Sequence, residues 1–486
     1  MIGRKNESRV LLEALETPRA EFIAVYGRRR IGKTFLVKNV YAGQLAFEFT
    51  GTQHATLKNQ LFKFSEKIKT HFGEAQAKQP PTTWYEAFQL LKNCLVKNTD
   101  RRQVVFFDEL PWIATPKSGF LEELGYFWND WAAYQPKLVI VVCGSAAAWM
   151  LQRVIGNKGG LHNRLTRRIN LKPFTLAEAK LFLESLGVHW DNYQTLQFYM
   201  AVGGVPAYLQ EARSGESVSQ AIDRLFFNQE GFLRTEFDNL YAALFASHQN
   251  HVSVIKALAE KWRGLTRQEI IAQSKMPDGG GLTQVLNELE AASFIMRFPL
   301  YKKRGTGFVY RLSDEYSLFY LRFVEGKPAP GKNEWLLQSG KEAYKIWCGY
   351  AYENICLKHA EAIKTALGIS GIHTQISTFL HKAEANGEGF QIDLLIDRAD
   401  RAMNLCEIKF YGDDFRLTEA YADYLRLRRE KFRRITGTKK QLFNTLVTTY
   451  PVSHGPASTG QIDQVVTMEK LFAYDSFGPP GSISNF

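Results

Sequence analysis

Cysteine is scarce in this chain of 486 residues, and a long apolar run is absent. The five cysteines lie far apart and form no C-x-x-C pair, which argues against a disulfide framework or a zinc module and favours a reducing compartment. The most apolar stretch, residues 138–151, is shorter than the ~20 residues of a membrane-spanning helix and contains Gly144 and Ser145. The N-terminus is charged and shows no apolar signal segment. We therefore expect a soluble, cytoplasmic protein.

Proline is also infrequent, with 16 residues, whereas apolar residues make up 45% and charged residues 23% of the chain. These proportions argue against a disordered or fibrous protein and are typical of globular domains, of which the length suggests about three. Basic residues outnumber acidic ones by 61 to 49, a formal net charge of +12. Such an excess is compatible with a polyanionic partner such as nucleic acid, and it is also compatible with a role in solubility alone. The positions of the charges have to distinguish these two explanations.

Short apolar runs alternate with helical patterns over residues 21–170. Strands are predicted at residues 22–26, 45–49, 104–107 and 138–142, and an amphipathic helix at residues 83–97. Continuous Val, Ile and Phe runs joined by helices are typical of a buried parallel sheet. We therefore predict an α/β domain over residues 1–174.

The rest of the chain divides by pattern into further segments. Helical periodicity predicts an all-helical segment at residues 175–248. Three helices and two strands are predicted within residues 249–325, at 253–260, 266–274, 282–292, 294–298 and 308–312. Pro and Gly then interrupt the periodicity, which predicts a linker at residues 326–340. Strands at 375–381, 390–396 and 403–410 predict a second, small α/β domain at residues 341–475, followed by a loose tail at 476–486.

Residues 27–34 read G-R-R-R-I-G-K-T, which matches the phosphate-binding pattern G-x-x-x-x-G-K-[ST] between a predicted strand and a predicted helix. The glycines let main-chain N–H groups turn toward phosphate oxygens, and the helix N-terminus adds partial positive charge. We expect Lys33 to reach the β- and γ-phosphates of ATP and Thr34 to bind Mg²⁺. The residues expected to contact the nucleotide here are Gly27, Arg28, Arg29, Arg30, Ile31, Gly32, Lys33 and Thr34.

The predicted strand at 104–107 ends in two acids, Asp108 and Glu109. We expect Asp108 to bind Mg²⁺ and Glu109 to polarise the attacking water, which makes Glu109 the candidate catalytic residue. Ser145 follows the next predicted strand, beside the expected position of the γ-phosphate. Its hydroxyl either senses that phosphate or caps the helix expected from residue 146.

With these motifs, the first part of the chain resembles the archaeal-type AAA-like ATPases, relatives of the STAND and origin-recognition ATPases. The opening Gly3-Arg4-Lys-Asn-Glu7 is similar to the N-terminal box of that family, and the resemblance places Gly3 and Arg4 near the adenine. Gly203-Gly-Val-Pro206 resembles the turn of the family's helical lid, which identifies residues 175–248 as that lid.

The same family often has an arginine before the lid that senses the γ-phosphate. Arg164, Arg167 and Arg168 precede the lid here, and Arg164 is slightly favoured for this role. The alternative is that these arginines are solvated surface charges. Whether such a residue acts within its own subunit or on a neighbour stays open.

The order of elements in residues 249–325 resembles a winged helix-turn-helix. Thr266 and Glu269 have the spacing of a capping box at the start of the second helix. The third helix has acids at Glu288 and Glu290, which repel phosphate, so it is poorly equipped to read DNA. The predicted nucleic-acid contacts of this segment are Lys302, Lys303 and Arg304, in the turn between the strands. DNA binding and a structural or protein-binding role are about equally compatible with the pattern.

Glu407 and Lys409 share a face of one predicted strand of the small C-terminal domain, and a hairpin would bring Asp393 of the preceding strand beside Glu407. With these residues the domain resembles the PD-(D/E)XK nuclease core. Two such carboxylates favour Mg²⁺, and the metal would activate water for phosphodiester cleavage with Lys409 orienting that water. The resemblance implies Glu353 as a further metal ligand. The alternative is a buried ion-pair network in an inactive copy of the fold.

Basic residues cluster after this strand, where residues 425–440 contain a single acid, Glu430. Such a surplus predicts salt-sensitive binding of nucleic acid. The expected contacts are Arg426, Arg428, Arg429, Lys431, Arg433 and Arg434.

The sequence therefore predicts an ATP- and Mg²⁺-dependent ATPase that binds nucleic acid, with DNA favoured, and cleaves it through the C-terminal domain. The alternative is a nucleotide-switched DNA- or protein-binding regulator with an inactive nuclease fold. A homo-oligomer or a partner protein is compatible with either function, and no membrane association is expected.

Overall fold

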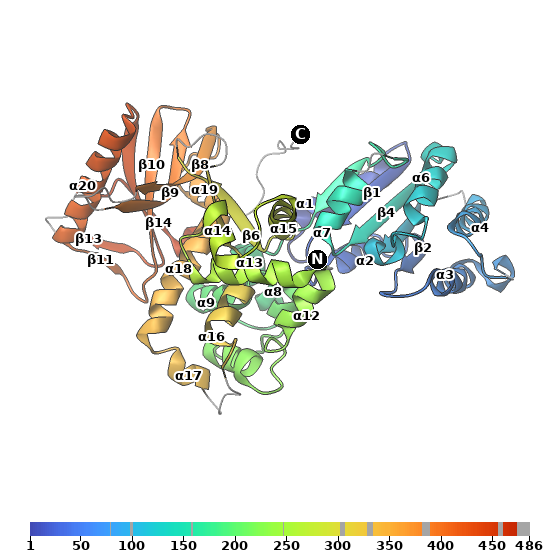
Figure 1. The fold of residues 1–486 in the computed structure, drawn as a ribbon, viewed down its shortest axis with the longest axis horizontal. Helices are drawn as coiled ribbons and strands as arrows, with labels where there is room; N and C mark the ends of the chain where they lie inside the picture. Colours follow the sequence, from blue (N-terminus) through green and yellow to red (C-terminus); the bar gives the residue numbers. More distant parts are fainter. Residues whose placement is uncertain are drawn as a thin grey trace. The chain divides into compact units, whose positions relative to one another are not determined.

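The computed structural model describes residues 1–77, 79–97, 101–156, 159–245, 247–301, 307–327, 334–381, 389–454 and 460–473. The chain divides into two compact units, whose elements are labelled in Figure 1. The N-terminal unit comprises Met1–Pro173, Ala243–Ala246 and Asn287–Ser293, and the C-terminal unit comprises Phe174–Ala242, Ser247–Leu286 and Phe294–Phe486. The first break lies next to the domain boundary expected at residue 174, while the later segments fall largely in one unit.

The N-terminal unit is built on a parallel sheet with the strand order β2-β3-β4-β1-β5. The strands are β1 (Glu21–Tyr26), β2 (Leu45–Thr50), β3 (Gln103–Asp108), β4 (Leu138–Gly144) and β5 (Arg167–Asn170). The predicted α/β fold and its four predicted strands are confirmed, with bounds that differ by at most two residues. The edge strand β5 was not predicted, because its sequence Arg-Arg-Ile-Asn contains no apolar run.

Helices cover both faces of this sheet, because side chains of a strand alternate between the two faces. Phe22 and Ala24 of β1 belong to the core formed with α3 (Leu57–Phe72), α4 (Trp84–Val96) and α6 (Phe120–Asp130). Ile23 and Val25 belong to the opposite core, formed with α1 (Lys5–Glu16) and α2 (Lys33–Val40). The carboxyl ends of the parallel strands β1, β3 and β4 consequently meet at one edge, which is where the phosphate-loop residues and the two acids are found.

The C-terminal unit begins with the helices of the expected lid. These are α8 (Leu176–Ser185), α9 (Asn192–Val202), α10 (Pro206–Leu209), α11 (Val218–Ile222) and α12 (Glu236–Leu244), the last of which ends at the margin of the unit. At the turn after α9, a side chain on Gly204 would lie 1.9 Å from the carbonyl oxygen of Phe174, so only glycine fits this close approach.

The helix–hairpin segment, residues 248–312, has the element order expected from the sequence. It comprises α13 (His248–Glu260), α14 (Arg267–Ser274), α15 (Gly280–Ala291), β6 (Ile295–Pro299) and β7 (Phe308–Leu312). Strands β6 and β7 pair in an antiparallel hairpin, and the capping box of Thr266 and Glu269 is present at the start of α14. The basic turn predicted to contact nucleic acid, Lys302, Lys303 and Arg304, lies outside the described residues.

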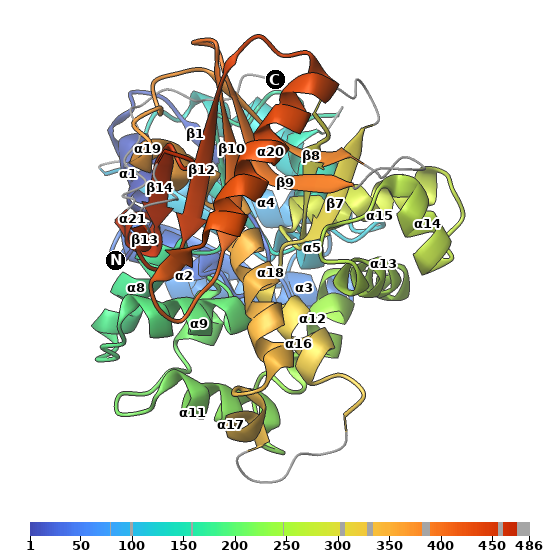
Figure 2. The ribbon, with the colours of Figure 1, turned by 90° about the vertical axis from the view of Figure 1, so that its left-hand side faces the viewer.

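The last segment, residues 341–475, contains a mixed sheet with the strand order β14-β12-β10-β9-β8. The strands are β8 (Thr374–His381), β9 (Phe390–Arg398), β10 (Ala402–Lys409), β12 (Gln441–Thr448) and β14 (Gln464–Thr467), with a separate short pair β11 (Phe415–Leu417) and β13 (Val452–His454). The helices are α18 (Glu342–Lys358), α19 (Ala360–Ala366), α20 (Glu419–Thr436) and α21 (Met468–Phe472). Helix α20 lies across this sheet (Figure 2), and its Phe432 packs in one core with Phe379 and Leu405.

The linker prediction for residues 326–340 is wrong for its second half. Residues Glu334–Gln338 form α17, and Trp335 is buried against Phe227, Phe319 and Phe323, the last two in α16 (Glu315–Phe323). A single tryptophan therefore anchors this stretch to the C-terminal unit, although the Pro and Gly residues before it interrupt the sequence pattern. Among the described helices, none has the length and apolar character needed to cross a membrane.

Candidate functional site

The phosphate loop, residues 27–34, joins the end of β1 to the start of α2. Gly27 has a φ of 148°, and a side chain there would lie 2.3 Å from the carbonyl oxygen of Leu171. Gly32, the N-cap of α2, has a φ of 87°, in the left-handed region that favours glycine. Both glycines of the pattern are therefore required by the backbone. The loop ends at a helix N-terminus, where free N–H groups favour a bound anion.

The first two residues of α2 meet the acid at the end of β3. The Thr34 hydroxyl donates a 2.7 Å hydrogen bond to the Asp108 carboxylate, and the buried Lys33 ammonium donates one of 2.7 Å to the main-chain oxygen of Arg28. Burial lowers the pKa of Lys33, while Cys143, Glu109 and Asp108 act in the opposite direction. A hydroxyl and a carboxylate side by side are ligands that suit Mg²⁺, so Thr34 and Asp108 fit that ion.

Glu109 is tied to the end of the neighbouring strand. The Ser145 hydroxyl donates a 2.5 Å hydrogen bond to one carboxylate oxygen of Glu109, and the Ser145 N–H donates one of 3.3 Å to the other. The following helix, α7 (Ala147–Trp149), has Ala146 as its N-cap and no side-chain cap. The helix-capping alternative for Ser145 is therefore wrong, and the serine hydroxyl is instead positioned against the candidate catalytic carboxylate.

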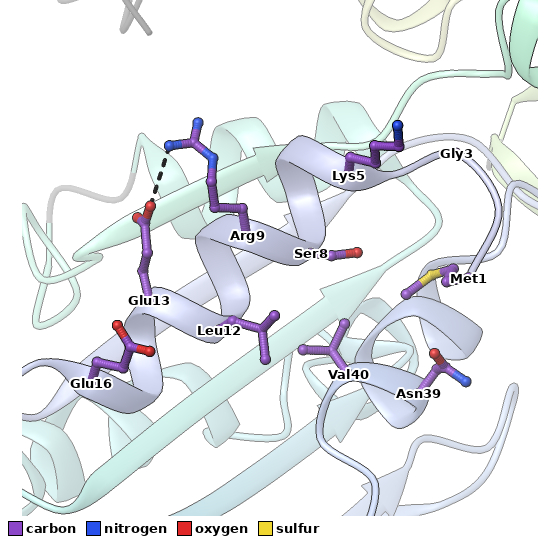
Figure 3. Close-up of a pocket in the computed structure, with 10 residues that line it drawn as sticks. All are labelled: Met1, Gly3, Lys5, Ser8, Arg9, Leu12, Glu13, Glu16, Asn39 and Val40. Carbon is purple, nitrogen blue, oxygen red and sulfur yellow. Dashed lines mark hydrogen bonds and ion pairs between the residues drawn. The ribbon is translucent and has the colours of Figure 1, made fainter. Parts of the chain in front are cut away.

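The N-terminal box is attached to the phosphate loop. The buried Arg4 guanidinium donates hydrogen bonds to the main-chain oxygens of Ile31, at 3.1 Å, and Lys172, at 2.6 Å. Gly3 lines a pocket of about 640 Å³ between α1 and the end of α2 (Figure 3). The phosphate loop does not line this pocket. The contact of Arg4 with Ile31 therefore places the box beside the loop and gives Arg4 a supporting role there.

The three arginines before the lid differ in their surroundings. Arg167 lies in β5 and pairs with Glu13 at 3.1 Å and Glu21 at 3.5 Å, so its charge is engaged inside the N-terminal unit. Arg164 and Arg168 are exposed. The choice of Arg164 as the γ-phosphate sensor stays a prediction.

In the C-terminal unit, Asp393 and Glu407 come together as expected from the strand pattern. Leu394 pairs with Cys406 across the antiparallel strands β9 and β10, so Asp393 and Glu407 are next to this pair and oppose each other. The N–H of Ile408 donates a 3.1 Å hydrogen bond to the Asp393 carboxylate. The hairpin predicted from the sequence therefore exists.

Glu353 of α18 joins these two acids in what we call the carboxylate centre (Glu353, Asp393 and Glu407). All three line a cavity of about 1270 Å³, together with Lys409. The Lys409 ammonium lies 2.9 Å from a carboxylate oxygen of Glu407. The residues that the sequence placed in a nuclease-like site thus share one cavity of the C-terminal unit.

Two of the three carboxylates form ion pairs with buried arginines. Arg428 of α20 pairs with Glu407, which also accepts a 2.7 Å hydrogen bond from the Tyr421 hydroxyl. Arg311 of β7 pairs with Glu353 at 2.6 Å, and both arginine side chains are only 2% exposed. In the part of the chain that the structure describes, no three His, Cys, Asp or Glu side chains are grouped so as to hold a metal ion. In this arrangement the carboxylate centre does not fit a divalent cation.

The electrostatics of the centre follow from burial and these pairs. Burial raises the pKa of Asp393 well above its ordinary value, and the charges of Glu353 and Glu407 add to the effect. Burial also acts to raise the pKa of Glu407, but Arg428 and Lys409 outweigh it and the pKa lies below its ordinary value. The centre therefore favours a protonated Asp393 beside an ionised, ion-paired Glu407.

The predicted nucleic-acid surface on α20 is less available than the sequence suggested. Arg428 is buried, so its assignment as a nucleic-acid contact is wrong. Arg426 lies within 3.4 Å of Asp423 and Glu430, and Arg429 lies 3.4 Å from Asp463. Two of these acids come from outside residues 425–440, which is why the sequence window showed only one. Of the remaining predicted contacts, Arg433 and Arg434 are exposed, and Lys431 lies over the ring of Phe390.

Sequence reasoning missed two residues that contact the carboxylate centre, Arg311 and Tyr421. Arg311 lies at an inward position of β7, where an apolar residue is usual. A charged residue at such a position is the signal by which the sequence could have revealed it. Tyr421 lies in the first turn of α20 and gives no such signal, because a tyrosine on an amphipathic helix is ordinary.

Comparison with known proteins agrees with the N-terminal site. Residues 1–212 match a family described as an ATPase domain predominantly from Archaea. A Walker-type ATPase of Pyrococcus abyssi has a similar fold, with a TM-score of 0.51 and 18% identity over 66% of this chain and 96% of that one. The ORC2 protein of Aeropyrum pernix matches with a TM-score of 0.42 and 14% identity, over 66% of this chain and 93% of its own.

An uncharacterised protein of Methanocaldococcus jannaschii is 23% identical over 422 residues, which is 84% of this chain and 87% of that protein. Residues 1–212 are thus similar to an archaeal ATPase domain family, and the fold shared with the Pyrococcus protein agrees with the phosphate-loop geometry.

Proposed function

We propose that the N-terminal unit binds ATP with Mg²⁺ and hydrolyses it. The observation that supports this most is the 2.7 Å contact of Thr34 with Asp108, beside the buried Lys33 at the end of the phosphate loop. Thr34 and Asp108 would hold the ion, which stabilises negative charge on the phosphates. Lys33 and the loop N–H groups bind the phosphates, Glu109 accepts the proton of the attacking water, and Ser145 orients Glu109.

Two substitutions separate binding from hydrolysis. Lys33→Ala abolishes nucleotide binding in a titration with ATP, while Glu109→Gln keeps binding and stops turnover. Lys38→Ala is the matched control, because Lys38 is an exposed lysine of the same helix that pairs with Glu48. Normal turnover in Glu109→Gln would refute its assignment as the base.

For the C-terminal unit we propose a role in handling nucleic acid, with phosphodiester cleavage at the carboxylate centre. The support is the convergence of Asp393, Glu407 and Lys409 on one cavity. The competing function is a nucleotide-switched regulator with an inactive nuclease fold, and the pairing of Glu407 with Arg428 favours it. A cleavage assay with Mg²⁺ or Mn²⁺ on single- and double-stranded DNA and RNA distinguishes the two. Equal behaviour of the wild type and Asp393→Ala would leave only the regulator.

A further inference from the structure

Helix α18 is attached to the helix–hairpin segment along one face. Tyr350 packs against Trp262 with ring centroids 4.1 Å apart, and Asn354 donates a 3.0 Å hydrogen bond to the main-chain oxygen of Leu312. Lys358 donates one of 3.2 Å to the main-chain oxygen of Ser313. Positions 350, 354 and 358 repeat every four residues, so they lie on one side of the helix. Glu353 lies on the same side and meets Arg311 there.

Arg311 is fixed where it meets Glu353. Its side chain is 2% exposed, and its Nε and Nη2 groups are buried without a hydrogen-bond partner among the described residues. A side chain on Gly264, whose φ is 85°, would lie 2.7 Å from Cγ of Arg311, so the turn after α13 closes tightly over the arginine. A buried guanidinium with incomplete hydrogen bonding is costly, and the Glu353 charge offsets that cost only while the two segments stay together.

Three basic groups already occupy the surroundings of the carboxylate centre. Arg311 pairs with Glu353, while Lys409 and Arg428 pair with Glu407. A divalent cation added here would be repelled by these positive charges, so one of the three basic side chains has to leave before a cation can bind.

Of the three basic groups, Arg311 alone comes from outside residues 341–475. Lys409 belongs to the same strand as Glu407, and Arg428 is on α20, whose neighbouring Leu425 and Phe432 are buried in this segment. Movement of β7 away from α18 would remove Arg311 and leave the other two in place. We propose that Arg311 closes the carboxylate centre to divalent cations until β7 withdraws from α18.

This inference rests on the proposed cleavage role of the carboxylate centre and gives that role a regulator, the helix–hairpin segment. Contact of β7 with α18 keeps the carboxylate centre closed to divalent cations. Separation of β7 from α18 frees Glu353 and opens the cavity to a cation. The ATPase proposed for the N-terminal unit is independent of this inference.

The test is Mn²⁺ binding, measured by electron paramagnetic resonance on the full chain without nucleotide. All proteins contain Lys33→Ala and Thr34→Ala, so that the phosphate loop does not contribute. Arg311→Met is expected to lower the Mn²⁺ dissociation constant by about tenfold or more, since one positive charge is removed beside the site. Adding Asp393→Asn abolishes that tightened binding, and Arg297→Met, an arginine of the partner strand β6, leaves binding as in the parent.

Trp262→Ala provides a second variant in case Arg311→Met fails to fold. It weakens the attachment of α18 while leaving Arg311, Lys409 and Arg428 unchanged, and it is also expected to tighten Mn²⁺ binding. Unchanged or weaker binding in the folded variants overturns the inference while leaving cleavage possible if the wild type binds Mn²⁺ through Asp393. Absence of Asp393-dependent binding in every protein overturns both the inference and the cleavage proposal, and leaves the ATPase proposal standing.

Discussion

The two polar centres of this molecule differ in what their charged groups contact. At the phosphate loop, the acids Asp108 and Glu109 accept hydrogen bonds from the hydroxyls of Thr34 and Ser145. In the carboxylate centre, Glu353 and Glu407 are paired with buried arginines. Hydroxyl contacts are easily exchanged for a ligand, whereas a buried ion pair is strongly destabilised when one partner is removed. The first centre is therefore arranged for ligand binding, and the second is arranged as a closed ion-pair network.

The comparison predicts that substitutions at the phosphate loop mainly change ATP turnover, whereas those in the carboxylate centre mainly change stability. The largest effect is expected at the phosphate loop. Asp108→Ala should reduce ATP turnover by about 10³-fold, because an Mg²⁺ ligand is lost and the ion contributes several kcal/mol of charge stabilisation. The free energy of unfolding should change by less than about 1 kcal/mol. Steady-state turnover and urea unfolding measure the two effects. Glu48→Ala, an acid of the neighbouring strand β2, is the control, and near-normal turnover of Asp108→Ala would break the comparison.

The converse prediction concerns Arg428. Arg428→Met leaves Glu407 buried without its guanidinium partner, and we expect a loss of about 3–5 kcal/mol in the free energy of unfolding of the C-terminal unit. The double variant Arg428→Met/Glu407→Gln removes both charges and should recover most of the loss. Urea unfolding measures both, and Arg433→Met on the exposed side of α20 should change stability by less than about 0.5 kcal/mol. A harmless Arg428→Met would mean that the network is open to solvent.

A third prediction uses pH to examine the C-terminal unit. His359 is buried, accepts a 3.1 Å hydrogen bond from the Leu176 N–H through Nε2, and has Nδ1 2.8 Å from the main-chain oxygen of Ile355. Burial lowers the pKa of His359 to about 4, so the folded protein keeps it neutral. In the unfolded chain it gains a proton below about pH 6.5. Stability is therefore complete above pH 6.5 and is lost as the pH falls toward 4, by about 3 kcal/mol.

Unfolding midpoints in urea between pH 4 and 7 measure this loss. His359→Gln should flatten the dependence over that range, and the exposed His189→Gln should keep the wild-type dependence. If His359→Gln retains the full dependence, other groups of the C-terminal unit are responsible.

The smallest effect is expected at Ser145. Ser145→Ala removes the hydroxyl that orients Glu109, and a hydrogen bond of about 1 kcal/mol corresponds to roughly fivefold in turnover. ATP affinity should stay unchanged, which a titration with ATP would show. A weaker affinity with unchanged turnover would instead place Ser145 in contact with the nucleotide.

The sequence was most informative where function requires particular residues in a fixed local order. The phosphate loop, the acids after β3 and the capping box of Thr266 are each recognisable within a short stretch of the chain, so the sequence alone locates them. The shared face of Glu407 and Lys409 followed from the period of two in a strand, and the approach of Asp393 followed from the expected hairpin. The β5 strand was missed because Arg167–Asn170 takes its stability from the neighbouring β1 and carries no apolar pattern of its own.

What the sequence could not predict depends on contacts between distant segments. Arg311 and Glu353 are 42 positions apart in different elements, and no spacing rule relates them. Arg428 belongs to a run of basic residues that reads as a solvated face, yet its position on α20 points it at Glu407. Trp335 similarly changes an expected linker into an anchored helix. Burial of a charge is a property of the assembled fold, and composition in a window does not reveal it.

Hydrogen exchange of the full chain with and without Mg·ATP tests the central distinction most directly. The account predicts slower exchange of the amides in residues 27–36 and 103–109 on addition of Mg·ATP, with no such effect in the Lys33→Ala variant. Unchanged exchange in these two segments, or protection confined to residues 393–409, would contradict the assignment of the nucleotide site to the phosphate loop.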